Sequence, residues 1–223
     1  MTSYVLVHGA WGGGHHYNGV ADRLRAHGHD VLIAQLTGLG ARQHLASPAI
    51  DLDCHVRDVV SQIHSAGLDD IILVGHSYGG MVITGVAGQL GGRIGHLVYL
   101  DAFLPGDGES LWDIVGEWER GHYIAGQRET PGLVAPLPGI DPDGRLGRHS
   151  LLTFLQPVHF TGREADIAHH SYIFASGWQP TPFTRFHDAV KDDPRWQVHV
   201  IPCGHGVMHD APEALLEILL AAG

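Results

Sequence analysis

The sequence predicts a single α/β domain, residues 1–223, in which helices flank a mostly parallel sheet of about six strands. Two observations support this prediction. Short aliphatic runs alternate with helical patterns, which is typical of parallel strands joined by right-handed crossovers. A glycine-flanked serine also stands between one of these strands and the helix that follows it. The predicted strands are residues 4–7, 30–34, 71–74, 97–100, 172–175 and 198–201.

Helices are predicted between these strands, because apolar residues there recur at helical spacing. In the second helix they fall on one face, which is expected to pack on the sheet behind a capping Asp51. The last helix is expected to open with Asp210 as its cap and Pro212 in its first turn. The predicted helices cover residues of about 17–27, 52–65, 81–90, 184–191 and 210 onward.

Residues 106–168 differ in character from the rest of the chain. Proline and glycine are scattered through them, aromatic residues recur, and no clear strand is visible. An irregular excursion packed only for stability would also fit this composition. Because the segment follows a strand whose carboxyl end should face the candidate site, we interpret it as a small, mostly helical cap inserted over that site.

Composition narrows the classes of partner. Acidic residues number 24 against 13 lysines and arginines, and the basic residues do not cluster, so nucleic acid and anionic membranes are not expected partners. Cys54 and Cys203 suggest no disulfide framework, so a reducing compartment is the expected setting. No signal peptide precedes the first strand and no apolar run reaches membrane-spanning length, which predicts a soluble, cytoplasmic protein.

The chain is organised around Gly75-His76-Ser77-Tyr78-Gly79, which directly follows a buried aliphatic strand. A serine between a strand and a helix, with glycine two residues to either side, is typical of a tight turn that exposes a nucleophilic hydroxyl. Larger residues at the glycine positions would clash across the turn. The alternative is a serine that merely caps the helix. The strand before it and the helix after it favour the nucleophile.

A second glycine-rich loop, residues 8–14, follows the first strand. It lacks the G-x-G-x-x-G spacing and the Lys-Ser/Thr pair of phosphate-binding loops. Dense glycine leaves room for a backbone N–H to face a reacting carbonyl, so we predict an oxyanion hole formed by the amides of Ala10 and Tyr78. A flexible connection is the simpler alternative.

A serine nucleophile needs a base, and position selects His205 among the 19 histidines. It follows the last predicted strand and has glycine on both sides, so its loop can carry the imidazole over the serine. His205 and His209 stand four residues apart but lack the glutamate of a zinc-binding H-E-x-x-H helix. The pairs at 15–16 and 169–170 are also expected to be solvated, so no metal site is predicted.

The sequence resembles the α/β-hydrolase superfamily, in the small branch of plant methylesterases, salicylate-binding esterases, hydroxynitrile lyases and related bacterial esterases. The resemblance implies an α/β-hydrolase fold and hydrolysis of carboxylic esters without a metal or organic cofactor. It also implies the chain order serine, acid, histidine for the catalytic residues. The resemblance covers nearly the whole chain and is carried by residues 5–11, 36–40, 74–82 and 204–208.

One departure from the family concerns the acid. Relatives usually place it shortly after the strand that matches residues 172–175, where this chain has Ser176-Gly177-Trp178 and no carboxylate. Some members of the superfamily place it instead at the end of the strand after the nucleophile helix, where this chain has Asp101. We therefore predict Asp101 as the acid that orients His205. An aspartate that caps the following turn is the alternative.

The predicted function is hydrolysis of small carboxylic esters through an acyl-enzyme. The substrate pocket is expected to be apolar and to contain Trp11, Phe103, Trp112 and Trp118. Two alternatives remain. A hydroxynitrile-lyase activity is disfavoured because residues 204–209 hold no lysine, and a slow or non-catalytic receptor is suggested by the missing usual acid. The expected partner is a small ester, and the oligomeric state is open, with a homodimer as one alternative.

Overall fold

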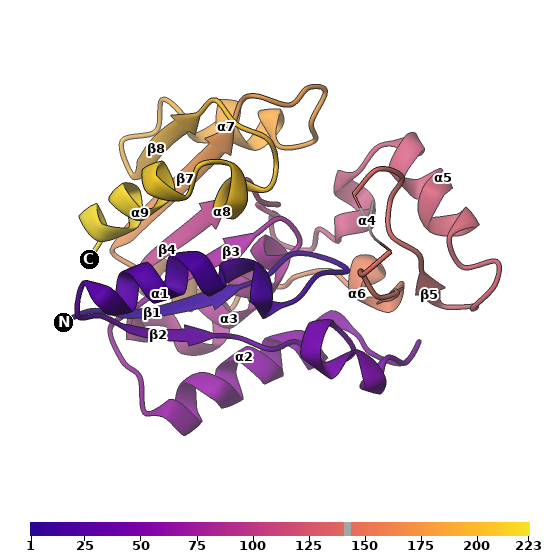
Figure 1. The fold of residues 1–223 in the computed structure, drawn as a ribbon, viewed down its shortest axis with the longest axis horizontal. Coiled ribbons are helices and arrows are strands. Elements are labelled where there is room, and N and C mark those ends of the chain that lie inside the picture. Colours follow the sequence, from indigo (N-terminus) through magenta and orange to yellow (C-terminus); the bar gives the residue numbers. More distant parts are fainter. Residues whose placement is uncertain (141–143) are drawn as a thin grey trace.

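The computed structural model describes residues 1–140 and 144–223 and has an α/β architecture (Figure 1). Its main sheet has six strands in the order β2-β1-β3-β4-β7-β8, and every neighbouring pair is parallel. The predicted fold class is confirmed. The strands are β1 (Ser3–Val7), β2 (Asp30–Ile33), β3 (Ile71–His76), β4 (Ile94–Leu100), β7 (His169–Ala175) and β8 (Trp196–Ile201).

The register of the central strands brings their carboxyl ends to one edge of the sheet. Val7 pairs with Gly75, and Leu100 pairs with both His76 and Ile173. The loops after β1, β3, β4, β7 and β8 therefore leave the sheet side by side. In parallel sheets this edge is where ligands bind.

Two layers of helices cover the sheet. On one face α1 (Asn18–Ala26) contacts α9 (Pro212–Ala221), and on the other α2 (Leu52–Ala66) contacts α3 (Gly79–Leu90) (Figure 1). Successive side chains of β1 point to opposite faces of the sheet. Tyr4 and Leu6 pack on the side of α1, and Val5 and Val7 pack on the side of α3. The remaining helices outside residues 106–168 are η1 (Gly14–Tyr17), η2 (Gly40–Leu45), η3 (Gly91–Arg93), α7 (Thr184–Val190) and α8 (Val207–Asp210).

Helix ends agree with the sequence in one case and differ in another. The Asp51 carboxylate accepts a hydrogen bond from the Cys54 amide at 2.8 Å and caps α2 as predicted. The predicted cap of the last helix is wrong. Asp210 closes the short helix α8, and α9 begins at Pro212 without a side-chain cap. The Asp210 carboxylate instead lies against Gly204, where a Cβ atom would come within 2.5 Å of Oδ2.

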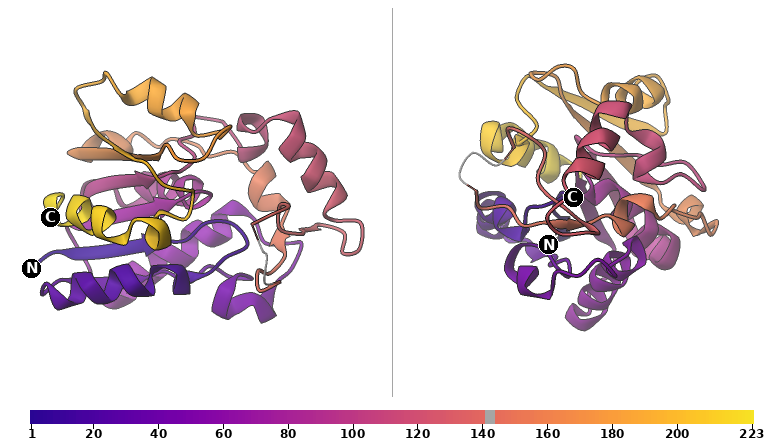
Figure 2. Two further views of the ribbon diagram at one scale, coloured as in Figure 1. Left: turned by 45° about the horizontal axis from the view of Figure 1, so that its top comes forward. Right: turned by 90° about the vertical axis from the view of Figure 1, so that its right-hand side faces the viewer.

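Residues 111–155 of the segment 106–168 lie beyond the carboxyl ends of the strands, away from both termini (Figures 1 and 2). The segment then returns along the domain, so that residues 163–166 contact the end of α3 and η3. The expectation that this segment lacks strands is wrong, because Leu133–Val134 and His149–Ser150 form a short antiparallel pair. Residues 141–143 of the segment lie outside the described residues. Its elements are α4 (Leu111–Ile114), α5 (Glu117–Ala125), β5 (Leu133–Val134), β6 (His149–Ser150), α6 (Leu152–Leu155) and η4 (Arg163–Asp166).

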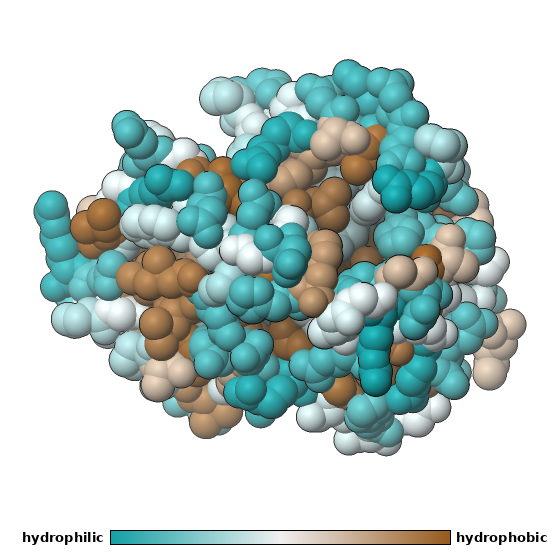
Figure 3. Space-filling model, turned by 180° about the vertical axis from the view of Figure 1, so that it is seen from behind, coloured by the Kyte–Doolittle hydropathy of each residue, from teal (hydrophilic) through white to brown (hydrophobic). Residues whose placement is uncertain are grey.

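The surface carries scattered apolar residues among polar ones. On the face turned away from the viewer in Figure 1, these residues form separate patches, several of them on the side occupied by residues 106–168 (Figure 3). Trp118 and Ile124 are the most exposed large apolar side chains of that segment among its described residues. Across the described chain, none of the helices combines the length and the apolar character needed to cross a bilayer.

Candidate active site

Ser77 occupies a tight turn between β3 and α3. Its φ is +55°, a left-handed conformation that is strained for a residue with a side chain. The flanking glycines make this turn feasible, because a Cβ atom on Gly75 would lie 2.6 Å from the Gly79 carbonyl oxygen. A Cβ on Gly79 would lie 2.7 Å from the Val7 carbonyl oxygen. The structure therefore has the strand–turn–helix geometry expected for this motif.

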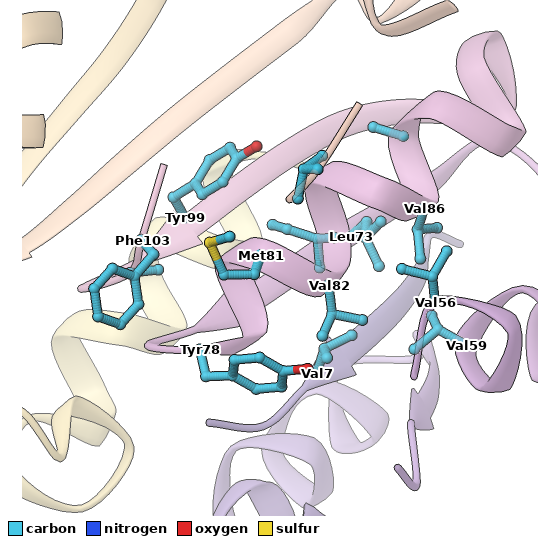
Figure 4. Close-up of a cluster of buried hydrophobic side chains, with 14 of the residues drawn as sticks. Val7, Val56, Val59, Leu73, Tyr78, Met81, Val82, Val86, Tyr99 and Phe103 are labelled. Atoms are coloured by element: carbon cyan, nitrogen blue, oxygen red, sulfur yellow. The ribbon is translucent and has the colours of Figure 1, made fainter. Parts of the chain in front are cut away.

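The amides of Ala10 and Tyr78 lie beside this turn. Neither donates a hydrogen bond to any acceptor in the described part of the chain, and both residues line the same cavity as Ser77. The glycine-rich loop approaches the serine closely, since a Cβ atom on Gly9 would lie 3.0 Å from the Ser77 Cβ. The Tyr78 side chain is buried in the core beside Val7 and Val82 (Figure 4). The buried Tyr78 side chain fixes the position of the Tyr78 amide. The amides of both Ala10 and Tyr78 remain free to donate to an oxyanion.

His205 lies on the loop after β8 and pairs with Asp101. Its Nδ1 is 2.7 Å from the Asp101 Oδ2, and the carboxylate is fully buried. A carboxylate accepts hydrogen bonds, so Nδ1 carries the proton and Nε2 keeps its lone pair. Asp101 itself has a φ of +41°, and its Oδ1 accepts a hydrogen bond of 3.1 Å from the Ala175 amide. The structure thus brings the predicted acid and the predicted base together.

Trp178 is a site residue that the sequence reasoning missed. It lies in the stretch after β7 that holds no carboxylate, and its indole Nε1 donates to the Asp101 Oδ2 at 3.0 Å. Its ring also packs on the His205 imidazole, with 4.9 Å between centroids. The absence of a carboxylate in this stretch was visible in the sequence. That signal could have suggested a donor directed at an acid on the neighbouring strand.

His76 contacts His205 through both a hydrogen bond and ring packing. Its Nε2 donates to the His205 carbonyl oxygen at 2.9 Å, and the two rings pack with centroids 4.5 Å apart. Burial, and secondarily the nearby His205, holds the pKa of His76 well below its usual range. His76 therefore stays neutral and places no positive charge beside His205.

Ser77 and His205 line one cavity of about 920 Å³. No hydrogen bond joins the Ser77 hydroxyl to His205 in the described residues, and such contacts often form only when substrate is bound. Of the four residues assigned to the substrate pocket from the sequence, Trp11, Phe103 and Trp118 line this cavity. Further lining residues include Leu111, Val115, Tyr123, Leu137, Ile140, Leu146, Phe154, Trp178, Phe183 and Met208.

Trp112 corrects one of the pocket predictions. It does not line the cavity, because its ring packs behind Tyr123 at a centroid distance of 6.4 Å. The Arg120 guanidinium covers the ring from outside, 5.7 Å from its centroid. Trp112 therefore packs against a lining residue, Tyr123, rather than lining the cavity itself.

Comparison with known proteins identifies the family. A model of the alpha/beta hydrolase family matches residues 4–218. The chain belongs to the alpha/beta hydrolase family. A carbendazim hydrolyzing esterase of Nocardioides sp. (strain SG-4G) is 41% identical to this hydrolase over 100% of both chains. The predicted family is confirmed, as is the predicted class of enzyme, a carboxylic ester hydrolase.

Solved structures support the fold assignment of this hydrolase. An extracellular alpha/beta-hydrolase from a Paenibacillus species superposes with a TM-score of 0.80 at 21% identity, covering 100% of this chain and 99% of the other. A methylesterase from Arabidopsis gives a TM-score of 0.79 at 22% identity, covering 100% and 98%. At such identities the likeness concerns the fold.

Other histidines of this hydrolase gather beside the cavity. The His16 Nδ1 lies 3.1 Å from the His209 Nε2, and the His15 ring packs on His16. Burial, followed by the proximity of His15 and His209, lowers the pKa of His16 to about 4. Within the described residues, no group of three or more histidine, cysteine or acidic side chains is arranged to hold a metal ion.

Proposed function

We propose that this hydrolase cleaves carboxylic esters through an acyl-enzyme on Ser77, with His205 as the base and Asp101 as the acid that orients it. The observation that carries the proposal is the 2.7 Å hydrogen bond between His205 Nδ1 and the fully buried Asp101 carboxylate. It leaves the His205 Nε2 unprotonated, on a residue that lines the same cavity as the strained Ser77. That is the arrangement that a serine nucleophile needs.

In the first half of the reaction, the Ser77 Oγ attacks the ester carbonyl carbon while its proton passes to the His205 Nε2. The negative charge on the carbonyl oxygen is held by the amides of Ala10 and Tyr78. Losing one such donor typically costs about 3 kcal/mol of transition-state stabilisation. The C–O bond then breaks and His205 gives its proton to the leaving alcohol. In the second half, water attacks the acyl-enzyme by the same proton transfers and releases the carboxylic acid.

The direct test is to trap the intermediate. A p-nitrophenyl ester mixed with the enzyme and quenched rapidly should leave its acyl group on the peptide that contains Ser77, detected by mass spectrometry. Ser77→Ala should abolish both the adduct and turnover. Acylation of another residue, or full turnover by Ser77→Ala, would contradict the proposal.

The cavity lining indicates the class of ester. Its volume of about 920 Å³ is large, and most of its lining residues are apolar or aromatic. Among the described lining residues, none is a lysine or an arginine, and one, Glu119, is acidic. A carboxylate or phosphate on the substrate would therefore lose its hydration without gaining a cationic partner. We propose uncharged esters with an aromatic group as the preferred substrates.

A matched pair of substrates tests this preference. Phenyl acetate and its para-carboxylate analogue should differ by at least about tenfold in kcat/KM in favour of the neutral ester, because burial of an unpaired charge costs more than 1.4 kcal/mol. Carbendazim, on which the esterase relative acts by its name, is a further neutral substrate to assay. Equal rates for the neutral and the charged ester would refute the preference.

Trp178 gives a prediction for the orientation of the acid. In Trp178→Phe an aromatic ring can still pack on His205, but the indole N–H that donates to Asp101 is lost. A hydrogen bond to a charged group contributes about 1.5–3 kcal/mol, so kcat is expected to fall roughly tenfold to a hundredfold. Steady-state kinetics with a neutral aryl ester measure the change. A rise in KM with kcat unchanged would instead assign Trp178 to substrate binding alone.

A further inference from the structure

The loop that carries Ala10 is tied to residues 106–168 through Trp11. The Trp11 amide donates to the His149 Nδ1 at 3.2 Å, and the Trp11 indole N–H donates to the Val134 carbonyl oxygen at 3.0 Å. Val134 and His149 pair directly opposite one another in β5 and β6. The short antiparallel pair therefore holds Trp11 at two points, one on its backbone and one on its side chain.

These contacts stabilise an unusual backbone conformation. Trp11 has a φ of +59°, and the Gly12 amide donates to the Ala10 carbonyl oxygen at 2.7 Å. This combination describes a γ-turn of the strained, positive-φ kind centred on a bulky residue. Such a turn persists only when its surroundings hold it. Its first residue is Ala10, so relaxation at Trp11 displaces Ala10 and with it the amide that faces the cavity.

His149 also contacts Tyr78, the second residue whose amide faces the cavity. Its ring lies edge-on to the Tyr78 ring at a centroid distance of 4.7 Å. The Tyr78 hydroxyl is fixed in turn by His55, whose Nδ1 lies 2.8 Å away. The His55 Nε2 donates to the Thr37 carbonyl oxygen at 2.9 Å, so its Nδ1 is left to accept from Tyr78. One imidazole thus contacts both Trp11, the residue that follows Ala10, and Tyr78.

The chemical state of His149 suits this position. The side chain is fully buried, and because Nδ1 accepts from Trp11, the proton sits on Nε2. The Nε2 has no partner among the described residues. Burial, with His55 and His8 nearby, holds the pKa of His149 well below its usual range, so the acceptor persists at neutral pH.

We infer that His149 is a positioning residue for the oxyanion hole. It fixes the geometry of the hole by accepting a hydrogen bond from the Trp11 amide and by packing on the Tyr78 ring. The inference rests on the proposed function, since it assumes that the Ala10 and Tyr78 amides stabilise the oxyanion. It assigns residues 106–168 a role in catalysis besides enclosing the substrate. The segment fixes the geometry of the hole through one buried imidazole.

Two substitutions at His149 separate the acceptor from the bulk of the ring. His149→Asn keeps an acceptor at the position of Nδ1, whereas His149→Leu removes it and keeps an apolar side chain. For a neutral aryl ester, His149→Leu is expected to lower kcat about 10- to 100-fold with KM within about threefold, because the amides act in the transition state. His149→Asn is expected to restore most of that loss.

A second readout follows the oxyanion hole directly. Phenylboronic acid forms a tetrahedral adduct with a serine nucleophile, so its inhibition constant should rise in His149→Leu in proportion to the loss of kcat. Ser150→Ala is the matched control on the same strand, because the Ser150 hydroxyl donates to the Ile50 carbonyl oxygen at 2.6 Å and, among the described residues, makes no hydrogen bond with Trp11. It should lower the melting temperature while leaving kcat unchanged.

Results that would contradict the role of His149 differ from those that would contradict the proposed function. Unchanged kcat in His149→Leu, equal losses in His149→Asn and His149→Leu, or a change in KM alone would each overturn the positioning role. If His149→Leu does not fold, His149→Gln takes its place, because it moves the acceptor one atom away from the Trp11 amide. Activity that survives in Ser77→Ala would overturn the proposed function itself, whatever the His149 variants do.

Discussion

Replacing Asp101 with asparagine is expected to lower kcat about 10⁴-fold while leaving the fold intact. Three donors converge on the two carboxylate oxygens of Asp101. The Ala175 amide reaches Oδ1, and the His205 Nδ1 and the Trp178 Nε1 reach Oδ2. An asparagine has one acceptor oxygen, so its amide group must face at least one of these donors.

The two orientations of the asparagine have different consequences. With its oxygen toward Ala175, its NH₂ group faces His205 and forces the proton of the imidazole onto Nε2, where it blocks proton uptake from Ser77. With its oxygen toward His205, the NH₂ group faces the Ala175 amide, a buried donor–donor contact that costs about 1–3 kcal/mol. In this second orientation the asparagine oxygen accepts from both His205 and Trp178, so His205 can still act as a base. The negative charge of the carboxylate, which stabilises the imidazolium, is lost. Either orientation slows the reaction.

Steady-state kinetics on a neutral aryl ester, with a melting curve for each variant, measure the effect. Asp69→Asn is the matched control, because Asp69 is an exposed acid whose ion pair with Arg93 lies at the surface. It should keep the wild-type kcat. A kcat for Asp101→Asn within a few-fold of wild type would show that another group orients His205 and would remove Asp101 from the proposed mechanism.

The two alternatives from the sequence have lost most of their support. The receptor hypothesis rested on the missing acid after β7, and in the proposed mechanism Asp101, directly after β4, takes that role through its hydrogen bond with His205. A cyanide-releasing lyase of the related kind would need a lysine beside the histidine. No lysine stands between Gly204 and His209, and none lines the described cavity.

The sequence was sufficient for the parts of the site that depend on strand ends. Ser77, Asp101 and His205 each follow a strand of the parallel sheet closely, and the carboxyl ends of such strands meet by construction. The glycines around Ser77 were predictable for a steric reason, since their hydrogens face carbonyl oxygens of neighbouring strands and turns. The position of these three residues after predicted strands was therefore enough to expect that they lie close together.

The remaining part depends on contacts that spacing does not encode. His149 reaches Trp11 across 138 positions, and Trp178 reaches Asp101 across 77. His149 lies on a two-residue strand and Trp178 in the loop after β7, and the paths of both segments follow from packing rather than from a helical or strand period. The same reason explains the error at Trp112, because composition could place an aromatic cluster over the cavity but could not say which ring faces inward.

Acid is expected to unfold this hydrolase well above pH 4, because several histidines are buried in the neutral form. Burial lowers the pKa of His8 from 6.5 to about 4, and it holds those of His55, His76 and His149 below their usual value. Each of these groups binds a proton in the unfolded chain at a pH where it remains neutral in the folded one. Stability is therefore fully present above pH 6.5 and is lost as the pH falls toward the folded-state values.

The magnitude is large compared with the stability of a typical domain. The shift of His8 alone corresponds to about 3 kcal/mol once the pH has fallen through both of its pKa values. Each further buried histidine adds up to about 1.4 kcal/mol per pH unit in the same window, against a total of about 5–15 kcal/mol. The pKa values of Asp113, Asp188 and Asp193 are lowered by hydrogen bonds, so these acids contribute only at lower pH.

Calorimetric melting temperatures between about pH 7 and pH 4.5 test this account, because the unfolding free energy depends on pH through protons taken up on unfolding. The melting temperature should fall steeply below about pH 6.5. His149→Asn removes one buried titrating group and should make the fall less steep, whereas His44→Gln removes an exposed histidine and should not. A melting temperature that stays level down to pH 5, or equal slopes in the two variants, would mean that these imidazoles accept protons without unfolding. Water would then have to reach them in the folded state, and the buried acceptor proposed at His149 would be lost in mild acid.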